Sequence, residues 1–222
     1  MLKKFVFVAA FICFAAAAQG QGQVTIAAQG VNVLALADDG TILPNGDAVR
    51  VGYIPAADLS LFQTSNVYST LSADFTAIGE GNSGGGTLTE NPTPSGIYLD
   101  INSFNSTPGA FDGTFNNVSS SYLTVGDPLY IWVFNNANPA AATQWGVFSG
   151  GTSWEFPSSF PGSASLSLAT ASPTPIRGTM LTSGADSGDF ELANVAVVPE
   201  PGSLSLVAGA GLLAGLAWRR RK

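Results

Sequence analysis

The side chains that could do chemistry in this chain are almost all carboxylates. The 222 residues include fifteen Asp and Glu, a single Cys and no His. Ser-His-Asp and Cys-His catalysis both need an imidazole, so neither can be assembled within the chain. Ordinary zinc sites are excluded as well, because His and Cys build them. Between residues 19 and 198 there is also no Lys, which excludes a Ser-Lys dyad.

The carboxylates leave two kinds of site open. A pair of them can hydrolyse a glycosidic bond, so a carbohydrate-active enzyme stays an alternative. Oxygen-rich turns at Asp38-Asp39-Gly40 and at Asp186-x-x-Asp189-x-Glu191 would suit calcium, although neither has the EF-hand spacing. Solvated turn acids explain the same residues. We therefore expect no catalytic residue, no metal site and no cofactor.

The most specific motif lies at the C-terminus and has three parts. In Pro199-Glu200-Pro201, two prolines fix φ and lack an N–H, so they present Glu200 on an extended backbone. Residues 203–218 are uncharged and mostly Leu, Val, Ala and Gly. As a helix these sixteen residues would span roughly 24 Å, a little less than a hydrocarbon core of about 30 Å. The positive-inside rule makes the last four residues a cytoplasmic membrane stop: Arg219, Arg220, Arg221 and Lys222.

This tail, from Val198 to Lys222, resembles the PEP-CTERM sorting tail. The resemblance implies that Pro199, Glu200 and Pro201 are the recognition motif of an exosortase, a membrane cysteine transpeptidase of Gram-negative bacteria that make exopolysaccharide. It also implies a transient intermediate in the inner membrane, processing near the motif, and delivery to the cell surface or extracellular matrix. A plain tail anchor and a buried core helix over 203–218 are the alternatives.

The N-terminus predicts a secretory signal peptide over residues 1–18. Lys3 and Lys4 give a positive start, an apolar run follows, and Ala16 and Ala18 fit an A-x-A cleavage pattern. An uncleaved anchor is the rival, although the apolar run is short for a bilayer span. Cys13 lies in that run without the small residues before it that a lipoprotein signal has, so we treat it as apolar filler.

Residues 19–197 are the predicted exported body. Only 10% of the chain is charged, and 26 Gly and 13 Pro favour many short strands joined by turns. Between residues 19 and 198 the chain has two cations, Arg50 and Arg177, and fourteen acids, which gives a formal net charge of −12. Such a surface repels nucleic acid and anionic lipid, so we expect no nucleic-acid partner.

Strand-like patterns run through this body and predict a mainly β fold, a single antiparallel β-sandwich flanked by the signal peptide and one C-terminal transmembrane helix. Residues 130–134 should form a central strand, 145–154 a hairpin turning at Gly150-Gly151, and 58–70 a helix. The predicted strands are Val24–Ala37, Ala48–Ile54, Gly96–Phe104, Pro128–Phe134, Gln144–Ser149, Ser163–Ala169 and Phe190–Val198.

Together these features predict a non-enzymatic surface or extracellular-matrix protein, sorted by its tail, with an adhesive or exopolysaccharide-associated role. Aromatics such as Trp145, Trp154 or Phe160 would stack on sugar rings if exposed, although we expect core packing for at least two of the three. The alternative function is a carbohydrate-active enzyme with a carboxylate pair.

Overall fold

A computed structural model describes the body of the chain between residues 24 and 195 with several gaps. The described residues are 24–30, 35–78, 87–88, 99–101, 107–118, 123–159, 161–168, 173–181 and 188–195. The strands are β1 (Val24–Gly30), β2 (Ala35–Leu36), β3 (Ala48–Tyr53), β4 (Thr76–Ala77), β5 (Thr87–Leu88), β6 (Leu99–Asp100), β7 (Phe111–Val118), β8 (Leu129–Phe134), β9 (Gln144–Ser149), β10 (Gly162–Ser167), β11 (Thr174–Arg177), β12 (Thr179–Met180), β13 (Phe190–Glu191) and β14 (Ala193–Asn194). The helices are α1 (Leu59–Thr64), α2 (Tyr68–Ala73) and the 3₁₀ helices η2 (Pro139–Ala141) and η3 (Gly151–Ser153).

Strand β8 lies at the centre of the larger sheet. The strand order is β11-β9-β8-β3-β4, with β14 also pairing β9 and β6 also pairing β3. All six residues of β8 are buried, which requires a covering layer on each face of the sheet. The predicted central strand is therefore confirmed.

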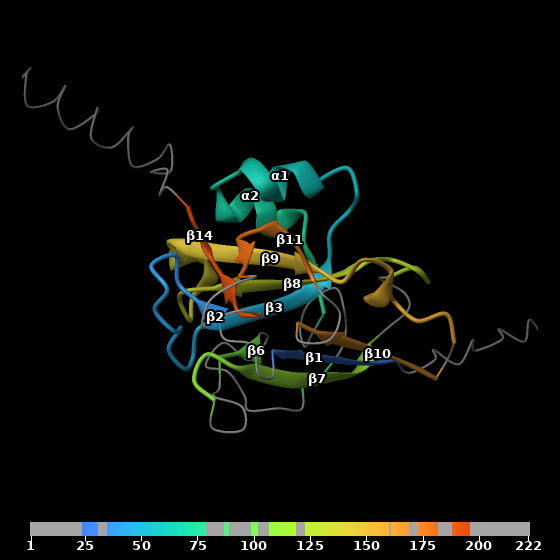
Figure 1. Ribbon diagram of the computed structural model, residues 1–222. Helices are drawn as coiled ribbons and strands as arrows, with labels where there is room; N and C mark the ends of the chain where they lie inside the picture. The colour runs from blue at the N-terminus through green and yellow to red at the C-terminus, as the bar shows by residue number, and fades with distance from the viewer. Residues whose placement is uncertain are drawn as a thin grey trace, which may run out of the picture.

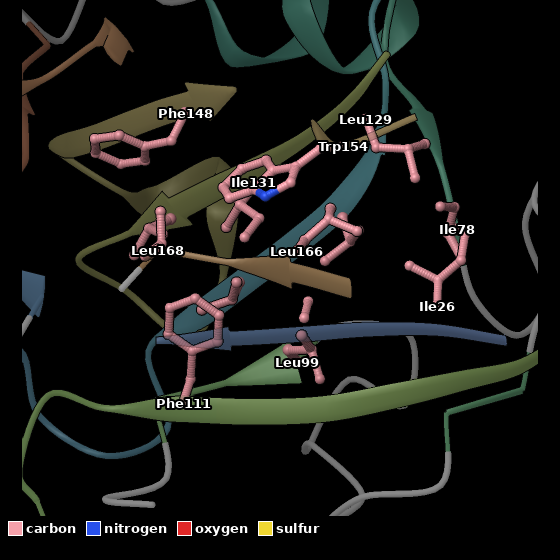
Figure 2. Close-up of a cluster of buried hydrophobic side chains, with 14 of the residues drawn as sticks. Ile26, Ile78, Leu99, Phe111, Leu129, Ile131, Phe148, Trp154, Leu166 and Leu168 are labelled. Carbon is pink, nitrogen blue, oxygen red and sulfur yellow. The ribbon is translucent and has the colours of Figure 1, made fainter. Parts of the chain in front are cut away.

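A second sheet, in the order β10-β1-β7-β5, covers one face of the first. Strand β1 alternates buried and half-buried residues, as expected of a strand with one face on a core. Figure 2 shows side chains of β1 and β7 pointing toward those of β8 across the space between the sheets. This main core is made of aliphatic and aromatic side chains, among them Ile26, Val51, Phe111, Ile131, Phe148, Trp154 and Leu166.

The short helices α1 and α2 cover the opposite face of the larger sheet (Figure 1). Phe62 of α1 and Leu71 of α2 are fully buried there. The ring of Trp132 lies 5.2 Å from Phe62 and 5.3 Å from Phe75, centroid to centroid, in edge-to-face contacts. The described chain thus has three layers: helices, a large mixed sheet and a smaller sheet.

The mainly β fold is confirmed, but its purely antiparallel pairing is wrong. Strand β10 runs parallel to β1, and β13 runs parallel to β2 in a small third sheet, β12-β13-β2. Parallel neighbours need a long connection. Here that connection is most of the body, because Val24 pairs with Gly162. A pattern of apolar residues fixes which face of a strand is buried and carries no information on such distant partners.

Strand β7 was not predicted, because its Gly and Asn resemble turn residues. In Phe111–Val118 the residues at 111, 113, 115 and 118 are nonetheless buried. The step of three at the end comes from a bulge, since Val24 and Ile26 of β1 oppose Val118 and Phe115. Asn117 makes this bulge with φ of 60°, a left-handed conformation that Asn tolerates better than most residues.

The predicted hairpin over 145–154 has the right turn but the wrong partner. Gly151 has φ of 57° and begins η3, so the chain does reverse after β9. The returning segment pairs with the entrance to β8, where Leu129 N–H donates to Trp154 O at 2.7 Å. A Cβ on Gly150 would come within 2.4 Å of the Trp154 ring, so the turn places this indole in the main core.

Several predicted elements are shorter than expected. The strands predicted at 48–54, 128–134 and 163–169 correspond to the slightly shorter β3, β8 and β10, whereas the strand predicted at 144–149 is β9 with the same bounds. The helix at 58–70 is two helices, α1 and α2, and the strand at 190–198 is divided into β13 and β14. The strand predicted at 24–37 corresponds, in its described part, to β1 and β2. The strand predicted at 96–104 corresponds in the same way to β6. No helix within the described residues is long and apolar enough to cross a membrane.

Candidate functional site

The described body ends at β14, immediately before the tail, so the surroundings of this strand are the candidate site. Ala193 pairs with Trp145 and Asn194 with Gln144 at the outer edge of β9. Val195 is 5% exposed, and its N–H donates to Thr143 O at 2.8 Å. Figure 1 shows β14 beside β9, on the same sheet edge as β11. The last described residues are thus held in the sheet.

A single carboxylate bridges the last strand pair. One oxygen of Asp38 accepts from Gln144 Nε2 and the other accepts from Asn194 Nδ2. The Asp38 backbone N–H donates to Gln144 Oε1 at 3.1 Å, which completes the grip on Gln144. Asp38 and Asn194 are both exposed. We call these three residues, Asp38, Gln144 and Asn194, the clasp.

Arg177 holds the same strand from the helical side. Its Nη2 donates to Asn194 O at 3.2 Å, and its Nη1 donates to Ser65 O, between α1 and α2, at 2.6 Å. The guanidinium carbon lies 5.3 Å from the centre of the Trp145 ring, a cation–π contact. Burial lowers the pKa of Arg177 below its usual value, yet an arginine stays charged at neutral pH. Arg177 therefore links the helical layer, β9 and β14.

Arg50 makes a similar link between the larger sheet and α2. It is 8% exposed, and its Nη1 donates to Ser72 Oγ at 2.9 Å and to Tyr68 Oη at 3.3 Å, both on α2. Its guanidinium carbon lies 4.8 Å from the Phe75 ring centre and 5.5 Å from that of Trp132. Both arginines of the body thus fasten the helical layer to tryptophans of the sheet.

Asp47 is the most perturbed acid of the described residues. It precedes β3, is 6% exposed, and its Oδ2 has no hydrogen-bond partner within the described chain. Burial raises the pKa of this carboxyl to about 6. Burial likewise raises the pKa of Asp100, although less. A buried carboxyl of this kind changes the free energy of unfolding with pH, and its low exposure prevents it from contacting a substrate.

The turn acids considered for calcium are described only in part. Asp38 belongs to the clasp, and Asp39 accepts from Thr41 N–H at 2.9 Å and from the Thr41 hydroxyl. These hydrogen bonds lower the pKa of Asp39. Asp186 lies outside the described residues, whereas Asp189 is 7% exposed. Within the described ranges no three acidic, His or Cys side chains gather closely enough to hold a metal ion.

Two of the three aromatics proposed for sugar stacking are core residues. Trp145 is 1% exposed and Trp154 is fully buried, on opposite faces of the larger sheet. Both therefore have the core-packing role expected for at least two of the three, and neither can stack on a sugar ring. Phe160 lies outside the described residues. Among the aromatic residues that the structure does describe, Tyr53 and Tyr68 are the partly exposed ones.

The predicted sorting and export residues all lie outside the described chain. They are Pro199, Glu200 and Pro201 of the motif, Ala16 and Ala18 of the cleavage pattern, the span 203–218, and Arg219, Arg220, Arg221 and Lys222. Sequence reasoning missed the clasp and both arginine links. The scarcity of cations is the signal that could have pointed to the arginine links, because Arg50 and Arg177 are the two cations of the body.

Comparison with known proteins bears on the tail. No curated protein matches the chain, and no solved structure matches its fold. Residues 197–222, however, match the family of the PEP-CTERM protein-sorting motif. Such a motif implies export through membrane-associated sorting to the cell surface, with an exosortase as the processing partner. The C-terminal segment that follows β14 is a PEP-CTERM protein-sorting motif.

Proposed function

We propose that the body is a non-enzymatic surface or extracellular-matrix protein of a Gram-negative bacterium, which an exosortase processes near Pro199-Glu200-Pro201 and which then associates with exopolysaccharide. The observation that carries this proposal is the match of residues 197–222 to the sorting motif. A signal peptide over 1–18 would start export, and the span 203–218 would hold the chain in the inner membrane until processing.

The uses of the polar side chains favour binding over catalysis. Asp38 and Asp39 make structural hydrogen bonds, and Asp47 is 6% exposed. A glycosidase needs two carboxyls that both reach an open site. Asp47, the acid with the pKa nearest neutrality, does not meet that condition. We keep a carbohydrate-active enzyme as the second proposal, in which the buried Asp47 has no catalytic role.

The charge of the body selects among polysaccharides. A formal charge of −12 between residues 19 and 198 repels acidic polymers at low salt, so we propose a neutral exopolysaccharide. Among the described aromatic residues we assign this contact to Tyr53, which packs only partly on the main core, because Tyr68 has its ring 5.7 Å from Trp132 and its hydroxyl bonded to Arg50. Burial first, and then the charges of Asp127 and Asp58, raise the pKa of Tyr53. Those nearby carboxylates would accept hydrogen bonds from sugar hydroxyls.

The sorting proposal is tested by the C-terminal mass of the surface form in the producing bacterium. We expect a chain that ends near residue 201 and lacks the four terminal cations. A Glu200→Ala variant should accumulate in the membrane at full length, whereas the matched Glu191→Ala variant should be processed normally. A surface form that retains Arg219 to Lys222 would refute processing.

The binding proposal is tested by co-sedimentation of the mature body with the producer's own exopolysaccharide. We expect Tyr53→Ala to bind about three- to tenfold more weakly and Tyr53→Phe to bind normally, since an aromatic contact contributes a factor of that order. Hydrolysis of a glycan panel, lost on substitution of one Asp or Glu, would instead support the enzyme.

A further inference from the structure

The tail joins the body by a very short connection. Val195 is fixed in the sheet, and residues 196–198 alone separate it from Pro199. A fully extended chain covers at most about 3.3–3.6 Å per residue, so Pro199 can lie no farther than roughly 14 Å from Val195. The predicted membrane span begins only four residues later, at Ser203. An enzyme that binds the motif as an extended segment must therefore work between the body and the membrane.

The strand before this connection is held weakly enough to leave. β14 has two residues, and Asn194 and its partner Asp38 are exposed. Exposed hydrogen bonds of this kind exchange readily with water, so short edge strands belong to the low-stability end of a fold. Val195 contributes the main buried apolar contact.

The residue before β14 is held more firmly. Leu192 is 2% exposed, belongs to the main core, and its N–H donates to Leu36 O at 2.9 Å. Detachment of residues 193–195 would stop at this point. It would double the free connection from three residues to six and add about 10 Å of reach.

We propose that β14 is a releasable strand: the clasp and Arg177 hold it on β9 during export, and its detachment gives the processing enzyme access to Pro199-Glu200-Pro201. This inference rests on the proposed processing of the tail and adds the step that controls it. Asp38 is the central residue, because its two oxygens join β14 to β9.

A disulfide between β9 and β14 tests the release directly. Gln144 and Asn194 face each other in the antiparallel pair. Facing residues of such pairs have Cα atoms about 4.5–5.5 Å apart, within the range that a disulfide spans. The natural chain has Cys13 as its single cysteine, in the predicted signal peptide. The Gln144→Cys/Asn194→Cys double variant therefore has one pairing partner for each new thiol.

The rate of processing is measured on full-length protein in membranes of the producing bacterium, by the C-terminal mass over time. We expect the oxidised double variant to be processed at least about tenfold more slowly than the natural chain. The same variant after reduction should be processed roughly two- to tenfold faster than the natural chain, since the clasp is gone. The two single-cysteine variants control for the substitutions themselves and should behave like the reduced form.

A second comparison uses charge-matched neighbours. Asp38→Ala should accelerate processing roughly two- to tenfold, as expected for a lost hydrogen bond, whereas Asp39→Ala should leave the rate unchanged because Asp39 bonds within its own turn. Equal rates for the oxidised and reduced double variant would overturn the releasable strand while leaving processing intact. A natural chain that is never shortened, with Glu200→Ala no different, would overturn the proposed processing itself.

Discussion

The two faces of the larger sheet are buried by different chemistry. Toward the smaller sheet the contacts are apolar, with Val51, Ile131 and Phe148 among them. Toward the helices, Arg50 and Arg177 lie over aromatic rings and donate hydrogen bonds to the helical segment. A helix of six residues is too short to be stable alone. The comparison shows that apolar area joins sheet to sheet, whereas the short helices combine buried aromatic contacts, such as that of Phe62 with Trp132, with hydrogen bonds from two arginines.

The largest expected effect comes from the apolar face. Ile131 is fully buried at the centre of β8, so Ile131→Ala should lower the free energy of unfolding by about 2–5 kcal/mol through lost contacts and a cavity. Urea denaturation followed by tryptophan fluorescence measures this. Val125→Ala is the control, since Val125 is 49% exposed and its truncation should change stability by less than about 0.5 kcal/mol. Equal losses would mean that the apolar face is not the main source of stability.

The second prediction concerns the pH dependence of the free energy of unfolding, which follows from the buried carboxyl of Asp47. Folding raises the pKa of Asp47 from 3.8 to about 6, so the folded state binds this proton more tightly than the unfolded state. The stability that protonation provides is present below about pH 4 and is lost as pH rises through 6. The loss is at most about 3 kcal/mol.

Asp47→Asn should remove that part of the pH dependence, which is measured by urea unfolding of both proteins between pH 4 and 7.5. Burial shifts Asp100 in the same direction, so the difference between the two proteins isolates Asp47. Parallel stability curves would show that Asp47 ionises without cost in the folded chain.

The polar links of the helical face are tested by Arg50→Met. Loss of charged hydrogen bonds to Tyr68 and Ser72 should weaken the attachment of α2 by about 1–3 kcal/mol. Hydrogen exchange read by mass spectrometry should speed up over residues 59–73, while amides of β1 and β7 keep their protection. Uniform loss of protection in all three layers would contradict a local fastening.

The smallest expected effect comes from removing Ser72, one of the two hydroxyls that accept from Arg50. Ser72→Ala removes one acceptor of Arg50 and leaves Tyr68, so we expect a loss of about 0.5–1.5 kcal/mol in thermal or urea unfolding. Ser60→Ala is the matched control, since Ser60 is an exposed serine of α1. A loss as large as that of Arg50→Met would assign the whole link to Ser72.

Local pattern predicted the elements with strong apolar faces. β3, β8 and β9 were expected nearly to the residue, because runs such as Tyr130–Phe134 combine β-branched and aromatic side chains. β7 was missed because Gly113 and Asn117 look like turn residues, although Phe111 and Phe115 occupy the buried face. The parallel partners of β1 and β2 were beyond prediction, since strand pairing depends on distant segments.

The sorting motif could be predicted from the sequence, whereas the clasp could not. Pro199-Glu200-Pro201 is a local motif, and the match over residues 197–222 bears it out. The clasp could not be predicted, because Asp38 and Asn194 meet only after the sheet has formed. Core packing was expected for at least two of Trp145, Trp154 and Phe160, but the sequence could not say which, because neighbours far along the chain decide whether Trp145 or Trp154 is buried.

The pairing of β1 has a consequence for the timing of folding. β1 is the first of the described strands, yet its two neighbours, β7 and β10, are contributed by residues 111–118 and 162–167. Such distant contacts slow folding. The smaller sheet can close only when residues 162–167 are available to pair with β1. In the proposed export, which would begin at the N-terminus, the smaller sheet would therefore close only after most of the body has crossed the membrane.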